Sequence, residues 1–302
     1  MNFTKQFKIE DLGVQELDVY DIEVEENHNF FANDILVHNS CYFTLENLNI
    51  YSEQDDKESK ADKLDNFIKT KVDPVIENSN LEFANFLNAY NPGVIKAERE
   101  VISDYAVFLS KKHYFMSVLD NEGVRYHDKS YIKKMGIDII KSSTPVFSRT
   151  NLSEALEIIL YSSDQELKKW LESVKTKFIN SKISDISKVS SVSKINYDLN
   201  DKGVPINSRA AIVYNNFLES SNLEKRFNKI QAGEKIKLIY LKKQNPTHQN
   251  ILAFNSEDFI QLFRDYIDYD TCWEKFFMSS LNQLIDGLNY NLSSKGKVLD
   301  EW

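Results

Sequence analysis

The 302-residue sequence has 37 basic and 46 acidic side chains, a formal net charge of −9 and 42% hydrophobic residues, a composition typical of a soluble globular chain. It contains no apolar run of about 18 residues and no charged-then-apolar leader after Met1, so we expect neither a transmembrane span nor a secretory signal. Its two cysteines, Cys41 and Cys272, favour a reducing compartment, and we expect a cytoplasmic protein. Residues 1–39 hold two lysines against nine acids, a charge of −7, which leaves −2 for residues 40–302.

The first distinctive stretch is residues 19–40. Tyr20, Ile22 and Val24 alternate with acidic residues, which predicts a short strand, and a polar turn and an apolar run then lead into His38-Asn39-Ser40. An Asn side-chain amide can attack its own main-chain carbonyl and cut the chain after itself if a neighbouring group protonates the leaving amine. A hydroxyl directly after the Asn can accept an acyl group. An ordinary hairpin with two unremarkable histidines is the alternative.

The whole ordered string resembles the C-terminal motifs of inteins, which are protein-splicing elements. The resemblance implies that Asn39 cyclises with the help of His38, and that Ser40 is the nucleophile that receives the N-terminal extein. By the same resemblance His28 is the second assisting histidine, and Asp21 directs proton transfers near the junction. No cofactor is implied for splicing.

The start of the chain, Met1-Asn2-Phe3, lacks the Cys or Ser nucleophile with which a self-contained intein begins. We therefore expect residues 1–39 to be the C-terminal fragment of a split intein, a short β-rich segment that completes a Hint-type β-fold with an N-intein on a second polypeptide. Their acidic charge would steer a basic N-intein toward them.

Past the junction, we expect a strand at 41–45, a loop at 51–60 and a helix from Lys63 that ends or kinks at Pro74, followed by a short helix near 81–87. A strand is predicted at 94–101, with Glu98 and Glu100 on one face. These two carboxylates are either solvated or part of a metal site for phosphoryl transfer.

Residues 105–150 are predicted to form strands at 105–109, 114–119 and 124–127, separated by turns. Eight basic residues stand against four acids there, a charge of +4 inside an acidic chain. This segment is either a footprint for a phosphate backbone or a set of sheet edges protected by lysines.

A second resemblance, to family B DNA polymerases of the T-even phage type, covers most of residues 40–302. Ser40-Cys41-Tyr42-Phe43 looks like the continuation of the family's Asp-Thr-Asp-Ser motif. Residues 97–100 resemble the acidic strand that lies beside the metal ions in that family. Residues 111–114 resemble its Lys-Lys-Arg-Tyr motif, with His113 in place of Arg. Residues 135–136 and 141–145, followed by short motifs around 190, 197, 209, 214 and 233–235, are also similar to that group, and we expect a strand at 236–241 directly after the last of them.

This resemblance implies an α+β protein with an α/β palm portion at 40–146 and a mainly helical thumb with a C-terminal tail at 147–302. A capping-box pattern at Ser163–Glu166 and helical spacing of aromatic residues near 276–285 support helices there. We expect those aromatic residues to lie in the core rather than to stack on bases. Binding of a sliding clamp by residues 298–302 is left open.

The resemblance further implies Mg²⁺ near Glu100 and Glu98, with the two principal carboxylates on the partner fragment. Its implied DNA contacts, together with the basic segment, are Lys111, Lys112, Tyr114, Lys133, Lys141 and Arg209. The expected function is thus a precursor that does not polymerise alone. It would be ligated by trans-splicing to an N-terminal polymerase fragment carrying the N-intein, and the ligated enzyme would copy primer-template DNA with dNTPs. The alternative is a non-splicing DNA-binding thumb subunit that docks non-covalently on that fragment.

Overall fold

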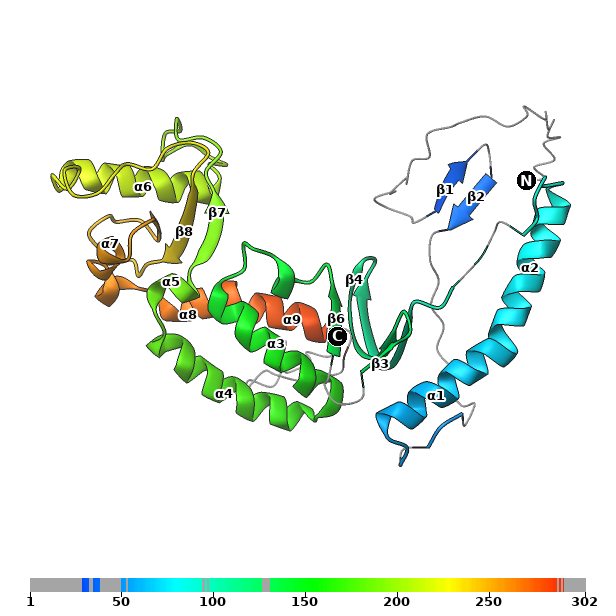
Figure 1. Cartoon of the computed structure of the whole chain (residues 1–302). Helices are drawn as coiled ribbons and strands as arrows, with labels where there is room; N and C mark the ends of the chain where they lie inside the picture. The colour runs from blue at the N-terminus through cyan, green and yellow to red at the C-terminus, as the bar shows by residue number, and fades with distance from the viewer. Residues whose placement is uncertain are drawn as a thin grey trace, which may run out of the picture. The chain divides into compact units, whose positions relative to one another are not determined.

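The computed structural model describes residues 29–32, 35–38, 50–52, 54–93, 96, 98–126, 131–286, 288 and 290. The chain divides into two units, Met1–Asn49 and Ile50–Trp302. In the first unit, β1 (Asn29–Ala32) and β2 (Ile35–His38) form an antiparallel hairpin in which Asn29 pairs with His38 (Figure 1). Of the residues predicted to splice, only the backbone of His38 is described. Asp21, His28, Asn39 and Ser40 lie outside the described residues, as do the strands predicted at 20–25 and 41–45.

The second unit opens with a long helical segment (Figure 1). It comprises α1 (Lys57–Phe67), a π-helical turn (Ile68–Val72) and α2 (Asp73–Phe86), and the Asp56 carboxylate caps its start by accepting a hydrogen bond from the Ser59 N–H at 2.7 Å. Of the two outcomes predicted at Pro74, the helix does not end there, but its regular α-helical geometry is interrupted by the π-helical turn just before the proline. Pro74 lies in the first turn of α2, where the missing N–H costs least, and the wider turn just before it accommodates the ring.

An antiparallel sheet follows the helices. It contains β3 (Val101–Ser110), β4 (His113–Asn121), β5 (Val124–Arg125) and β6 (Tyr131–Met135); β4 pairs with β3 along one edge and with β5 and β6 along the other. The three strands expected at 105–127 are confirmed in type and order. The strand expected at 94–101 is wrong, because residues 98–100 belong to no strand and pairing starts at Val101. That segment is held by one backbone hydrogen bond, from the Glu122 N–H to the Glu100 carbonyl at 2.7 Å, and by contacts of the Arg99 side chain.

Helices pack on this sheet. A 3-10 turn (Asp138–Ile140) leads into α3 (Val146–Tyr161) and α4 (Asp164–Asn180). The predicted cap is confirmed, since the Ser163 hydroxyl accepts a hydrogen bond from the Glu166 N–H at 3.4 Å. Phe115 of β4 is fully buried in the same apolar cluster as α3, whereas α1 contacts β3 and β4. The buried apolar cluster therefore continues across the predicted boundary at residue 146.

A second sheet lies in the C-terminal half. After α5 (Ile183–Ile186), strands β7 (Lys188–Ser191), β8 (Lys235–Tyr240) and β9 (Ile251–Phe254) pair antiparallel in that order, and α6 (Ile206–Ser220) packs on β9. The strand expected at 236–241 is confirmed as β8. The strands that pair with it, β7 and β9, were not predicted. Residues 147–302 therefore contain a three-stranded sheet as well as the predicted helices.

The last elements are α7 (Glu257–Gln261), a 3-10 turn (Arg264–Tyr266), α8 (Tyr269–Trp273), a π-helical turn (Glu274–Met278) and α9 (Ser279–Ile285). The aromatic rings of Phe276 and Phe277 belong to the core, as predicted. Trp273 stacks on Phe277 with ring centroids 4.4 Å apart, and Phe147 of α3 meets Phe178 of α4 edge-on at 5.2 Å. None of the described helices is both long and apolar enough to cross a membrane.

Replacing Phe277 with alanine should lower the free energy of unfolding by about 4 kcal/mol, because the fully buried ring packs against both Phe147 and Trp273 and its loss leaves a cavity. Urea titration followed by circular dichroism would measure the loss. Phe86→Ala is the control: that ring is 82% exposed, and its removal should change the value by less than about 0.5 kcal/mol. Equal losses for the two variants would contradict the packing described here.

Candidate nucleic-acid interface

The turn between β3 and β4 presents two of the predicted DNA contacts. Lys111 is exposed and Lys112 half-buried, and the His113 ring nitrogen Nδ1 lies 2.8 Å from the Lys111 carbonyl oxygen. Lys112 has a φ of 59°, a left-handed conformation that is uncommon for a residue with a side chain. The turn is tight, and its conformation is fixed by its surroundings.

Gly136 holds this turn in place from the end of β6. Its φ is +67°, and a Cβ atom built on it would lie 2.2 Å from the Lys112 carbonyl oxygen and 3.0 Å from the His113 ring. Only glycine allows the two backbones to approach this closely. The Met135-Gly136 segment and the Lys111-Lys112 turn are therefore one local structure.

Two further cations lie at the same end of the sheet. Lys134 of β6 pairs in register with Phe115, and its amine donates a hydrogen bond to the Ser153 hydroxyl of α3 at 3.4 Å. Ser153 in turn donates to the Arg149 carbonyl at 2.9 Å, which places Arg149 one helical turn away. We call Lys111, Lys112, Lys134 and Arg149 the hairpin-end cluster.

Other basic residues of the 105–150 segment are engaged within the fold. The guanidinium of Arg125 contacts the carboxylates of Asp62 at 2.9 Å and Asp120 at 3.0 Å. Lys141 lies 2.9 Å from a carboxylate oxygen of Asp138. The segment charge of +4 therefore overstates what is available to a nucleic acid, while Lys111 at the turn is exposed.

Lys133 and Glu100 were predicted for different roles, DNA binding and metal binding, but the structure joins them in an ion pair. Burial alone would lower the pKa of Lys133, yet the hydrogen bond and charge of Glu100 outweigh it and raise that pKa. The Lys133 amine also lies 3.3 Å from the side-chain oxygen of Asn121. Glu98 is exposed.

Between Glu98 and Glu100, the Arg99 side chain turns inward to two carboxylates. Its Nε lies 3.1 Å from Asp65 of α1, and its Nη1 donates to Asp120 of β4, which is only 1% exposed. Arg125 of β5 binds the same two carboxylates from the other side. Burial would raise the pKa of Asp65, but Lys69 and the two guanidinium groups hold it below its ordinary value.

The fit to Mg²⁺ is partial. Glu98 and Glu100 offer the oxygen donors that Mg²⁺ prefers, whereas Asp65 and Asp120 are occupied by arginines. Among the described residues, no three His, Cys, Asp or Glu side chains are grouped so as to hold a metal ion. The described part of the chain could therefore supply only some of the ligands of such a site.

The remaining predicted contacts are Tyr114 and Arg209. Tyr114 follows the turn on β4, with its ring centroid 5.6 Å from that of Phe108. Arg209 is on α6, where it donates to the Asn250 side chain at 3.4 Å. Nearby, Tyr214 is fully buried; burial and then the charge of Glu234 raise its pKa to about 12, and its hydroxyl donates to the Asn228 carbonyl at 3.1 Å. Tyr214 thus has a structural role in α6.

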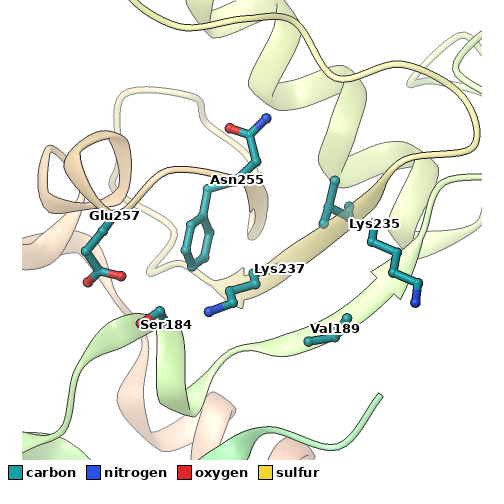
Figure 2. A pocket seen from close by; sticks show the side chains of 8 residues that line it. Ser184, Val189, Lys235, Lys237, Asn255 and Glu257 are labelled. Atoms are coloured by element: carbon teal, nitrogen blue, oxygen red, sulfur yellow. The ribbon is translucent and has the colours of Figure 1, made fainter. Parts of the chain in front are cut away.

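Figure 2 shows an open pocket of about 360 Å³ on the second sheet. Lys235 and Lys237 of β8 line it together with Glu257 at the start of α7 and Ser184 of α5. The remaining lining residues are Val189, Ile236, Phe254 and Asn255. Its charges are of both signs, so the pocket does not by itself define a ligand. A Lys-x-Lys pattern on a strand was the signal in the sequence for it.

Sequence reasoning missed the roles of Arg99, Asp65 and Asp120. Their separation along the sequence gives no local signal. Lys134 and Arg149 were counted in the basic segment but not singled out.

No protein family model matches the chain. It is similar, however, to proteins of one class, DNA polymerases. It is 30% identical over 142 residues to the DNA polymerase of Thermococcus litoralis, which covers 47% of this chain and 7% of that protein. A DNA polymerase of Thermococcus sp. strain GE8 is 31% identical over 159 residues, which cover 53% of this chain and 8% of that protein. The DNA-directed DNA polymerase of Enterobacteria phage T4 is 22% identical over 270 residues, covering 83% of this chain and 29% of that protein. The chain thus matches less than a third of the length of each of these relatives, and these similarities support a function related to that of DNA polymerases.

Gly136→Ala should lower the free energy of unfolding by about 3 kcal/mol, because it adds backbone strain and a clash with the Lys112 carbonyl. Gly233→Ala is matched to it, since Gly233 has a φ of +89° but nothing within 4 Å of the added Cβ; it should cost only about 1 kcal/mol. Urea denaturation would measure both. If the two costs are the same, Gly136 does not hold the turn.

Proposed function

We propose that this chain is the C-terminal part of a split family B DNA polymerase of the T-even phage type. The observation that carries the proposal is the similarity to DNA polymerases, which extends over 83% of the chain for the phage T4 enzyme. Lys111 and Lys112 of the hairpin-end cluster are the residues to which the resemblance gives primer-template contacts, and Glu98 and Glu100 are those to which it gives metal ligation. The palm would occupy residues 40–146 and the thumb 147–302.

The cluster suits a nucleic-acid backbone for electrostatic reasons. Each lysine or arginine that neutralises a phosphate releases condensed counterions, so cations on one edge of a sheet give salt-dependent affinity without reading sequence. Gly136 and the close packing of the turn restrict Lys111 and Lys112 before DNA arrives, which lowers the entropy lost on binding.

Mg²⁺ would neutralise charge on the incoming triphosphate during polymerisation. In the ligated enzyme, Glu100 and Glu98 would contribute oxygen atoms to it, and the N-terminal fragment would supply the principal carboxylates. Lys133 would have to release Glu100 for this to occur, because one carboxylate oxygen is now bound to its amine. The chain alone would then bind DNA without extending a primer.

Ligation to the N-terminal fragment would proceed by trans-splicing. The Ser40 hydroxyl would attack the ester or thioester that links the N-terminal polymerase piece to the first Cys or Ser of the N-intein, forming an ester on Ser40 and releasing the hydroxyl or thiol of the N-intein. The Asn39 amide nitrogen would then attack the main-chain carbonyl of Asn39, closing a succinimide and releasing the Ser40 amine, and the acyl group would move from oxygen to that nitrogen. The ordered motif of residues 19–40 supports this step of the proposal.

Mixing the chain with its N-terminal partner fragment should yield, by intact mass spectrometry, a product heavier than this chain that lacks residues 1–39. The double variant Asn39→Ala, Ser40→Ala should give no such product, because it has neither the cyclising amide nor the acyl acceptor. Unchanged masses of wild-type fragments that still co-elute would refute splicing and leave a non-covalent thumb subunit.

Lys111→Ala should weaken binding of a primer-template duplex by the chain roughly fivefold and reduce the salt slope of the binding constant by about 0.9, because one phosphate contact is lost. Fluorescence anisotropy at several salt concentrations would measure both quantities. Lys168→Ala provides the control, since Lys168 lies on α4 beside Asp164. A slope that changes equally in both variants would place the DNA elsewhere.

A further inference from the structure

We infer that Arg99 is a positioning residue for the acidic segment: its inward side chain sets the place and direction of Glu98 and Glu100 on either side of it. This inference rests on the proposed function, because it concerns the carboxylates that would face the metal ions.

Apart from Arg99, the segment is held at Glu100, whose carboxylate pairs with Lys133. Residues 98–100 belong to no strand, and the backbone bond described there runs from the Glu122 N–H to the Glu100 carbonyl at 2.7 Å. Arg99, by contrast, reaches carboxylates from two separate elements, Asp65 of α1 and Asp120 of β4. Its side chain thus ties the acidic segment to a helix and to the centre of a sheet at once.

The inward side chain of Arg99 determines which way the two neighbouring glutamates face. Arg99 turns inward to Asp65 and Asp120, and Glu98 and Glu100 on either side of it face outward. Their exposure agrees, since both glutamates are exposed while Arg99 is half-buried. Asp65 and Asp120 resemble metal ligands in residue type, but here they hold the arginine.

The strength of the anchor comes from its burial. Asp120 is 1% exposed, and its oxygens are approached by Arg99, by Arg125 at 3.0 Å and by the Gly123 N–H at 2.9 Å. Removing one partner from a buried charge pair is costly because the other charge is left without compensation. A planar guanidinium with five donors can bridge two carboxylates in a fixed geometry, which a lysine ammonium cannot reproduce.

Arg125 offers a matched control. It binds the same two carboxylates from β5, but it is not adjacent to the glutamates. Arg99→Lys and Arg125→Lys should therefore disturb the network similarly, while only Arg99→Lys displaces Glu98 and Glu100.

The test uses the ligated polymerase bound to primer-template DNA and measures Mn²⁺ binding by electron paramagnetic resonance, with hydrogen exchange at the Glu122 amide as a second readout. Arg99→Lys should weaken Mn²⁺ binding at least fivefold and accelerate exchange at Glu122, whereas Arg125→Lys should change either by less than twofold. Equal changes in the two variants, or none in Arg99→Lys, would overturn the positioning role.

Failure of the proposed function would look different. In that case the wild-type chain would form no ligated polymerase, or the ligated wild-type protein would bind no Mn²⁺, and the positioning role would fall with it. Weak binding in Arg99→Lys alone, with wild-type and Arg125→Lys binding normally, supports both.

Discussion

The buried carboxylate of Asp120 is the contact on which the arrangement of the first sheet most depends. It is shared by Arg99 and Arg125, and both arginines also reach Asp65 on α1. One network thus connects the long N-terminal helical segment, two strands and the acidic segment 98–100. A buried charge without its partner is strongly destabilising, so these elements are constrained to keep their mutual positions.

The opposite end of that sheet is governed by backbone sterics. The left-handed Lys112 and the glycine at 136 allow the β3–β4 turn to lie against the end of β6, and α3 adds Ser153 and Arg149 beside Lys134. Four cations are gathered there by three separate elements. Strand β4 therefore links the two ends of one small sheet. It follows the turn that carries Lys111 and Lys112, and its Asp120 holds Arg99 in the acidic segment 98–100.

A count of formal charges overstates the charge that a ligand can reach, because many charged side chains are already paired within the fold. The 105–150 segment has a formal excess of basic residues, yet Arg125, Lys133 and Lys141 each lie against a carboxylate. The same holds for motifs around α6: Asn215 accepts a hydrogen bond from the Ile230 N–H and donates to its carbonyl, both at 2.9 Å, so it fastens a loop to the helix. Side chains that look like ligand contacts in a sequence can be fully engaged in the fold.

The sequence by itself determined the local features: the strands of the meander at 105–127, the cap at Ser163, strand β8 and the aromatic core positions near the C-terminus. Each follows from spacing within a few residues, where periodicity and turn chemistry act. Only the tertiary structure decided that residues 98–100 lie outside the strand, that Lys133 binds Glu100, and that Arg99 joins Asp65 to Asp120, 55 positions apart in the sequence. Such contacts depend on how the helix and the strands pack together. A charged side chain that becomes buried needs an oppositely charged partner, and that partner can lie far away in the sequence, where no local pattern indicates it.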